Sequence, residues 1–191
     1  MDAQEVLRAF QDTGAVRHGH FQLTSGRHSD TYIQCARVLE QPRLTMRLAE
    51  AAVAGLPAGL KTDLVAAPAI GGILFGFAVA SVLDLPFVFS ERKDGQMSLR
   101  RDFQVPPGAR VLVAEDVVTT GGSVRELIDL IQDAGAEVCA VVALADRGGE
   151  KRFDQPFYPL AAIATPSWEA ADCQLCQSGQ PITAPGSRSL T

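Results

Sequence analysis

The chain has 191 residues and a formal net charge of −5 at pH 7, with 47% hydrophobic and 20% charged residues. This composition excludes a disordered chain, and an acidic balance without a long basic run argues against nucleic acid as a partner. Because no apolar run reaches about 18 residues and no signal-peptide pattern follows Met1, we expect a cytoplasmic protein without a membrane partner.

The N-terminal part predicts a helix followed by a hairpin. Apolar residues favour a short helix over residues 2–12, which Gly14 ends. Two extended pieces then flank the turn Ser25-Gly26-Arg27, and the second piece reaches Ile33. This hairpin is either an ordinary surface feature or a small hood over a binding site, because it gathers polar, basic and aromatic side chains.

Helices and strands alternate through the middle of the chain. Pro42 suits the first turn of a helix that runs to about Gly55. The expected elements that follow are a strand over 63–67, a turn at Gly71 and Gly72, a helix over 73–83 and a strand over 86–89. This alternation predicts an α/β fold, in which a parallel sheet binds ligands beyond the carboxyl ends of its strands.

Residues 90–105 carry four cations around a glycine, namely Arg92, Lys93, Arg100 and Arg101. The segment is either a solvated hairpin or a mobile basic lid. We favour the lid, because its cations would stabilise an anionic leaving group while the lid excludes water from a reactive intermediate.

The stretch from Val111 to Ser123 predicts a buried strand that leads into a polar loop. Its first residues are apolar and rich in valine, and Glu115 and Asp116 are expected at the carboxyl end of the strand. Hydroxyl side chains and glycines occupy residues 119–122.

A helix should follow this loop. Val124, Leu127, Ile128 and Ile131 recur at helical spacing. Ser123 or Gly122 is the expected cap, Glu126 stands at capping-box spacing from Ser123, and Gly135 is placed to end the helix.

This strand, loop and helix together predict a site for a phosphorylated sugar. The first amides of a helix have no internal partner and carry partial positive charge, so residues 119–123 would hold a phosphate. Glu115 and Asp116 would repel the same phosphate and instead suit a ribose diol or Mg2+. The patterns of a Walker loop and of a dinucleotide fingerprint are both missing.

The last part of the chain adds a strand over 138–145, followed by Asp146-Arg147, a strand over 158–164 and a surface segment over 165–191. The turns after four strands should therefore converge at one site. Cys35 and Cys139 are expected to be inert thiols in or near the core. Cys173 and Cys176 form a C-x-x-C motif. In other proteins such a motif can be half of a zinc site or a redox-active pair. With no second pair and no histidine close in sequence, we interpret it as a turn with two thiols.

The pattern over 111–123 resembles the signature of phosphoribosyltransferases that use 5-phosphoribosyl 1-diphosphate (PRPP). The chain also resembles the orotate phosphoribosyltransferases along nearly its whole length. Three motifs carry this resemblance: the hairpin motif from Phe21 to Ser29 with Tyr32, then Glu91-Arg92-Lys93, and then Asp146-Arg147.

The resemblance implies the type I phosphoribosyltransferase fold, a parallel twisted sheet flanked by helices with a small N-terminal hood. We expect a single domain over residues 1–191, with a core of about 41–165 and a hood of about 1–40 plus the C-terminal segment. The implied reaction joins orotate to PRPP, gives orotidine 5′-monophosphate and diphosphate, and belongs to de novo pyrimidine synthesis. Mg2+ is implied as the cofactor, and a homodimer whose lid reaches the partner's active site is implied as the assembly.

The resemblance also assigns roles to residues. Arg92, Lys93 and Asp116 would be catalytic. The PRPP site would comprise Arg92, Lys93, Glu115, Asp116, Val117, Val118, Thr119, Thr120, Gly121, Gly122 and Ser123, with Glu115 and Asp116 as possible Mg2+ ligands. Orotate would contact Thr119, Arg147, Tyr32 and Ile33.

Some positions depart from the family's pattern. Many relatives have lysine where this chain has Thr24 and Gly71, and a histidine in the lid that this chain lacks. No general acid can therefore be assigned in the lid, and Arg100 and Arg101 are the candidates for its charge. A phosphoribosyltransferase for another base and a non-catalytic PRPP-binding regulator are the alternative functions.

Overall fold

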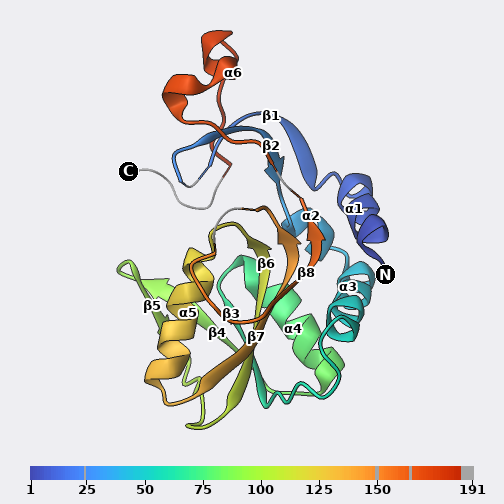
Figure 1. Cartoon of the computed structure of the whole chain (residues 1–191), viewed down its shortest axis with the longest axis vertical. Coiled ribbons are helices and arrows are strands. Elements are labelled where there is room, and N and C mark those ends of the chain that lie inside the picture. The colour runs from blue at the N-terminus through green and yellow to red at the C-terminus, as the bar shows by residue number, and fades with distance from the viewer. Residues whose placement is uncertain (24, 149–150, 164, 186–191) are drawn as a thin grey trace.

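The computed structural model describes residues 1–23, 25–148, 151–163 and 165–185. Its main sheet has six strands in the order β5-β4-β3-β6-β7-β8 (Figure 1). The strands are β3 (Leu64–Pro68), β4 (Phe87–Lys93), β5 (Gln96–Leu99), β6 (Arg110–Val118), β7 (Glu137–Asp146) and β8 (Phe157–Ala162). All neighbours are parallel except β4 and β5, which form an antiparallel hairpin. The parallel α/β sheet expected from the sequence is confirmed.

Helices cover both faces of this sheet. They are α1 (Ala3–Asp12), α2 (Ala36–Leu39), α3 (Pro42–Ala54), α4 (Gly71–Leu83) and α5 (Gly122–Asp133). Side chains alternate along a strand, so Leu112 and Ala114 of β6 join the core cluster with α1 to α4, while Val111 and Val113 join the cluster with α5. The central strand is thus buried on both sides, which explains its continuous apolar sequence. Within the described residues, no helix is both long and apolar enough to span a bilayer.

A second, two-stranded sheet lies at one end of the molecule, on the side toward which the parallel strands run (Figure 1). It is the predicted hairpin, formed by β1 (Val16–Gln22) and β2 (His28–Ile33). The tail, residues 165–185, borders this hairpin on both sides, through a parallel bridge from Phe21 to Thr183 and an antiparallel bridge from His28 to Trp168. The tail also contains a 3-10 turn (Ala170–Asp172) and α6 (Gln174–Gln177).

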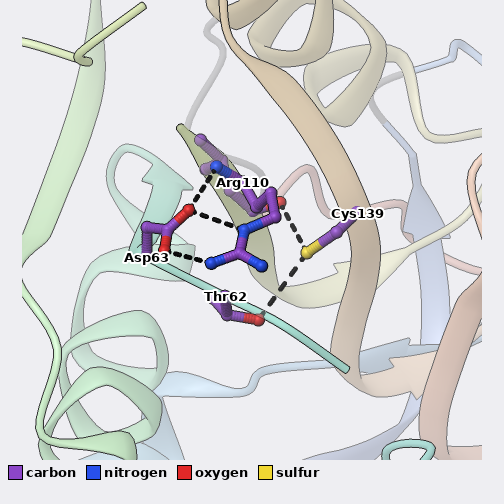
Figure 2. Close-up of polar contacts among 5 residues, drawn as sticks. Thr62, Asp63, Arg110 and Cys139 are labelled. Atoms are coloured by element: carbon purple, nitrogen blue, oxygen red, sulfur yellow. Dashed lines mark hydrogen bonds and ion pairs between the residues drawn. The ribbon is translucent and has the colours of Figure 1, made fainter. Parts of the chain in front are cut away.

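A polar cluster braces the opposite, amino-terminal ends of β3 and β6 (Figure 2). The carboxylate of Asp63 accepts hydrogen bonds from the backbone N–H of Arg110 at 2.9 Å and from its Nε at 2.8 Å. These bonds lower the pKa of Asp63 to about 2. The Cys139 thiol donates to the carbonyl of Val111 at 3.3 Å, and its Sγ lies 3.7 Å from Oγ1 of Thr62. Cys139 therefore lies near the core, as expected, and its thiol takes part in this polar cluster.

Several element boundaries differ from the expectations. Strand β4 continues to Lys93 because its last residues pair with β5. Strand β6 does not end before the acid pair but continues to Val118, since Val117 and Val118 pair with Ala145 and Asp146 of β7. Strand β8 ends at Ala162, and the predicted terminal residue Ala164 lies outside the described residues.

The capping box predicted for α5 is wrong. The residue that caps this helix is Gly121, which has a left-handed backbone with φ +74°, and no side chain caps the helix. Glu126 instead forms an ion pair with Arg92 of β4. The other end agrees with the prediction, because Gly135 follows the helix with φ +80°.

Candidate functional site

The acid pair lies near the carboxyl end of β6 and is largely buried. Glu115 is 8% exposed, and its Oε1 accepts a hydrogen bond from the backbone N–H of Asp116 at 3.2 Å. Oδ1 of Asp116 accepts from the N–H of Val117 at 2.8 Å. Burial raises the pKa of both carboxyls, and the charge of Asp116 raises that of Glu115 further. Such a pair favours a ligand that brings hydroxyl donors or positive charge.

The glycine turn before α4 packs directly against these carboxylates. A Cβ added to Gly71 would lie 2.6 Å from Oδ2 of Asp116, and one added to Gly72 would lie 3.0 Å from Oε1 of Glu115. The absence of side chains at both positions is what allows the start of α4 to reach the acid pair. Gly71 is one of the two positions at which this chain lacks the lysine of many relatives. The other position, Thr24, lies outside the described residues.

The predicted phosphate loop joins β6 to α5. Thr119 and Thr120 are exposed, Gly121 makes the left-handed turn, and Gly122 and Ser123 begin the helix. Because no side chain caps α5, the amides of its first turn remain available to an anion. The backbone N–H of Arg152 donates to the carbonyl of Thr120 at 2.8 Å and holds the loop from the other side.

Arg147, which directly follows β7, and Tyr32, on β2 of the hairpin, come together beside the acid pair. The N–H of Arg147 donates to the carbonyl of Val118 at 2.8 Å, and its Nη2 donates to Oγ1 of Thr165 at 2.7 Å. Burial lowers the pKa of Arg147 and raises the pKa of Tyr32. Arg147 opposes that rise and Asp116 adds to it, so all three groups interact electrostatically. Ile33 differs, since its side chain is buried in the core cluster with α1 to α4.

The basic segment lies over the start of α5. The guanidinium of Arg92 donates to Glu126, with Nη2 2.6 Å from Oε1, and to the carbonyl of Gly95. Arg101 forms a two-point ion pair with Glu91 and lies over the ring of Phe89. Lys93 and Arg100 are exposed, and neither makes an ion pair with any other residue that the structure describes.

Sequence reasoning missed two features. Phe153 packs against Gly121, whose missing side chain leaves room for the ring. The second feature is that the C-x-x-C, interpreted from the sequence as a turn with two thiols, lies against His20 and His28, which are not close to it in sequence. The hairpin predicted from the sequence already places the two histidines on neighbouring strands, but no local pattern connects them to cysteines 153 residues away.

The arrangement combines three kinds of recognition at one edge of the sheet. The uncapped start of α5 suits a phosphate, the acid pair suits a polyol or a cation, and Arg147 suits a carboxylate or a planar anion. Lys93 and Arg100 add exposed positive charge on the basic segment, residues 90–105. A phosphorylated sugar beside an anionic planar molecule would use all of these groups.

Comparisons with known proteins agree with this chemistry. The family described as phosphoribosyl transferase domain matches residues 35–172. The orotate phosphoribosyltransferase of Heliobacterium modesticaldum is 47% identical over 190 residues, covering 98% of this chain and 100% of that protein. That of Acidithiobacillus ferrooxidans is 46% identical over 195 residues and covers 100% of both. The crystal structure of orotate phosphoribosyltransferase from Aeropyrum pernix superposes with a TM-score of 0.72 at 26% identity, over 83% of this chain and 93% of that one.

Proposed function

Since this chain belongs to the orotate phosphoribosyltransferases, within the phosphoribosyltransferase family, we propose that its site transfers the phosphoribosyl group of PRPP to orotate. The products are orotidine 5′-monophosphate and diphosphate, in de novo pyrimidine synthesis. The observation that carries the proposal is the buried acid pair next to the uncapped start of α5, with Arg147 and Tyr32 beside it.

The residues suggest how PRPP is held. The amides of Gly121, Gly122 and Ser123 and the hydroxyls of Thr119 and Thr120 would bind the 5-phosphate, favoured by the dipole of α5. Val117 and Val118 have apolar side chains, so only backbone groups that their pairing with β7 leaves free could contribute. Glu115 and Asp116 would accept hydrogen bonds from the ribose hydroxyls, which keeps the anomeric carbon in a fixed position.

The reaction then needs stabilisation of charge more than a base. A ring nitrogen of orotate bonds to the anomeric carbon as the bond to the diphosphate oxygen breaks, and the sugar passes through an oxocarbenium-like state. The proton on that ring nitrogen leaves as the new bond forms, and the departing diphosphate, whose oxygen gains negative charge, can accept it, so no strong base from the protein is required. Arg147 would pair with the carboxylate of orotate, and Tyr32 would contact its ring, while Ile33 would contribute only backbone.

The lid would act on the leaving group. The diphosphate gains negative charge as it departs, so the cations Lys93 and Arg92 stabilise it more in the transition state than in the ground state. Arg92 would have to exchange Glu126 for the diphosphate when the lid closes. Of the two arginines further along the lid, Arg100 is the better candidate for an added charge, because Arg101 already pairs with Glu91.

Mg2+ fits the donor set of this site. Glu115 and Asp116 offer hard carboxylate oxygens at the carboxyl end of β6, and their raised pKa values mean that a nearby cation would stabilise the charged forms. When bound with the diphosphate, Mg2+ would neutralise part of the negative charge of the leaving group.

We also propose a homodimer in the cytoplasm, without nucleic acid or membrane as partner. An apolar stripe over the first part of α4, together with Ile70 directly before the helix, supports the dimer. Ile70, Leu74 and Phe77 are 82%, 54% and 60% exposed and follow one another at helical spacing. Exposed apolar side chains in one row are typical of a surface that a second copy of the chain covers. In such a dimer, the lid of one chain would approach the active site of its partner.

An assay of orotate consumption with PRPP and Mg2+ tests the proposed function. We expect turnover of orotate and little turnover of adenine or hypoxanthine. Asp116→Asn should lower kcat/KM for PRPP strongly while leaving the thermal unfolding midpoint nearly unchanged, and Asp129→Asn on the exposed face of α5 is the matched control. Turnover of a purine base without orotate would assign another transferase, and PRPP binding without any turnover would assign a regulator.

A further inference from the structure

A cluster of two histidines and two cysteines joins the hairpin to the tail, apart from the acid pair. His20 lies on β1, His28 begins β2, Cys173 directly precedes α6 and Cys176 lies within it. One ligand atom from each residue lies within 4.8 Å of the other three. We propose that these four side chains bind a structural Zn2+ ion that fastens the tail to the hairpin.

The distances between the donor atoms match a tetrahedral site. Nε2 of His20 lies 3.2 Å from Nδ1 of His28, 3.5 Å from Sγ of Cys173 and 3.6 Å from Sγ of Cys176. Sγ of Cys176 lies 3.2 Å from Nδ1 of His28. Zinc bonds of about 2.0–2.1 Å to nitrogen and about 2.3 Å to sulfur give tetrahedral edges of roughly 3.3–3.8 Å. Four of the six distances between donor atoms are thus close to those edges, and the remaining two, from Sγ of Cys173 to His28 and to Cys176, are within 4.8 Å, so small shifts would close the four ligands around an ion.

The protonation of His20 also fits a metal ligand. Its Nδ1 lies 2.8 Å from the carbonyl oxygen of Gln180. A carbonyl can only accept, so Nδ1 carries the proton and Nε2 directs its lone pair at the cluster. A backbone carbonyl that fixes the imidazole in this way is the usual outer partner of a metal-binding histidine.

The surroundings favour a closed structural site over a catalytic or redox one. His20, His28 and Cys173 are buried, while Cys176 is exposed. Four protein ligands leave no open position for a substrate, as is usual for structural zinc. Two thiolates balance the charge of a divalent ion, so the buried site would be neutral. Two cysteines with two histidines suit zinc better than the harder Mg2+ or Ca2+.

The backbone around the cluster explains what the ion would do. The hairpin and the tail already share hydrogen bonds, from the N–H of Gln22 to Thr183 and from the N–H of His28 to Trp168, both at 2.8 Å. Between those two bridges the tail leaves the hairpin to form the turn that carries Cys173 and α6 (Figure 1). This excursion has few apolar residues to bury, and a metal would supply the missing stabilisation.

Metal analysis of the purified full chain tests the proposal. We expect about one zinc ion per chain after gel filtration, retained in a buffer without added metal. Cys173→Ser combined with Cys176→Ser should lose this zinc, whereas Cys139→Ser, which changes a cysteine outside the cluster, should keep it. A zinc content near zero in the wild type after growth with added Zn2+ would overturn the proposal, and so would full zinc retention in the double variant.

A second measurement needs no variant and covers the case in which the double variant fails to fold. Zinc is removed from the wild type with a chelator under reducing conditions, and Co2+ is added. Tetrahedral coordination by thiolates should give intense visible bands and a sulfur-to-cobalt charge-transfer band. The weak spectrum of octahedral cobalt would overturn the proposal. A thiol titration in denaturant with a chelator, before any reductant is added, that finds two thiols fewer than the four in the sequence would assign a disulfide instead.

The role of the ion has its own readout. Chelation should speed proteolytic cleavage within residues 165–185 and lower the unfolding midpoint, and added Zn2+ should reverse both effects. Unchanged cleavage after the zinc is gone would contradict a structural role. None of these measurements depends on orotate turnover, so they stand even if the proposed function fails.

Discussion

Gly71 is the residue whose lack of a side chain matters most to the acid pair. Alanine there would place its Cβ 2.6 Å from Oδ2 of Asp116, which is closer than a real contact allows. To make room for this Cβ, either the carboxylate of Asp116 must rotate or the start of α4 must move away from it. We expect Gly71→Ala to lower kcat/KM for PRPP by about 100-fold, since a shift of about 1 Å in a positioning group has that effect.

The control for this change is Gly55→Ala at the end of α3. Its Cβ would meet carbonyl oxygens of Ala51 and Ala52 at an ordinary 3.5 Å, so activity should stay at the wild-type level. Steady-state kinetics with varied PRPP measures both variants. Wild-type kcat/KM in Gly71→Ala would show that the position of Asp116 is not critical.

Asp63 makes the stability of the molecule depend on pH. Its folded-state pKa is about 2, because Arg110 donates hydrogen bonds to the carboxylate, whereas an unfolded aspartate titrates near about 3.9. A lowered pKa stabilises the fold above the unfolded value, and this contribution is lost as the pH falls from about 4 to about 2. Water screens this exposed pair, so the effect should be small.

We therefore expect Asp63→Asn to unfold at a lower urea concentration than the wild type at pH 6, with a smaller difference at pH 3. Urea titrations at the two pH values measure this difference. Asp129→Asn, which removes another exposed carboxylate, gives the baseline. A difference that grows as the pH falls would mean that the hydrogen bonds shown in Figure 2 do not hold in solution.

Among the elements, the junction between β6 and α5 depends on a glycine with a left-handed backbone. Gly121→Ala would combine a strained φ of +74° with overlap between the new Cβ and the ring of Phe153. The backbone term is about 1–2 kcal/mol and the overlap about 1–3 kcal/mol. The free energy of unfolding should therefore fall by about 2–5 kcal/mol.

Gly122→Ala is the matched neighbour. It has a helical backbone, and its Cβ would meet nothing within 4 Å. Its stability should equal or slightly exceed that of the wild type, because alanine is the better helix former. Thermal unfolding of both variants measures the contrast, and equal midpoints would mean that Phe153 and the left-handed turn impose no constraint.

The same junction shows what the sequence could predict at the level of elements. The apolar spacing of Val124, Leu127 and Ile131 located α5, and the valine run located β6. The cap could not be predicted, because Ser123 and Glu126 fit a capping box locally while Arg92, far away in the sequence, takes Glu126. Pairing between strands decided where β4 and β6 end, through a local hairpin with β5 for β4 and through the more distant β7 for β6.

For the whole molecule, the apolar stripe on α4 predicts how two chains associate. Leu74→Glu combined with Phe77→Glu should convert the proposed dimer to a monomer, because charge would replace two half-exposed apolar side chains. Ile182→Glu, which changes an apolar residue 43% exposed on the tail, should leave the mass unchanged. Light scattering after gel filtration measures the mass, and a wild-type mass in the double variant would place the interface elsewhere.

The site as a whole was more predictable than the tail. The strand order of a parallel sheet brings its carboxyl ends together, so the positions of Asp116, Arg147 and the α5 loop followed from the order of elements along the chain. The meeting of His20 with Cys173 did not follow, because neither hydrophobic periodicity nor spacing records a contact between side chains 153 residues apart.

The bridges from the tail to both edges of the hairpin constrain the order of events during synthesis. The hairpin leaves the ribosome while the tail that borders it is still to be translated, since Ser167 follows Arg27 by 140 residues. Until then β1 and β2 have two open edges, which invite pairing with other nascent chains. Co-translational folding should therefore complete the layers around the main sheet first and the region around Tyr32 last, so substrate binding would report on the docking of residues 165–185 against the hairpin.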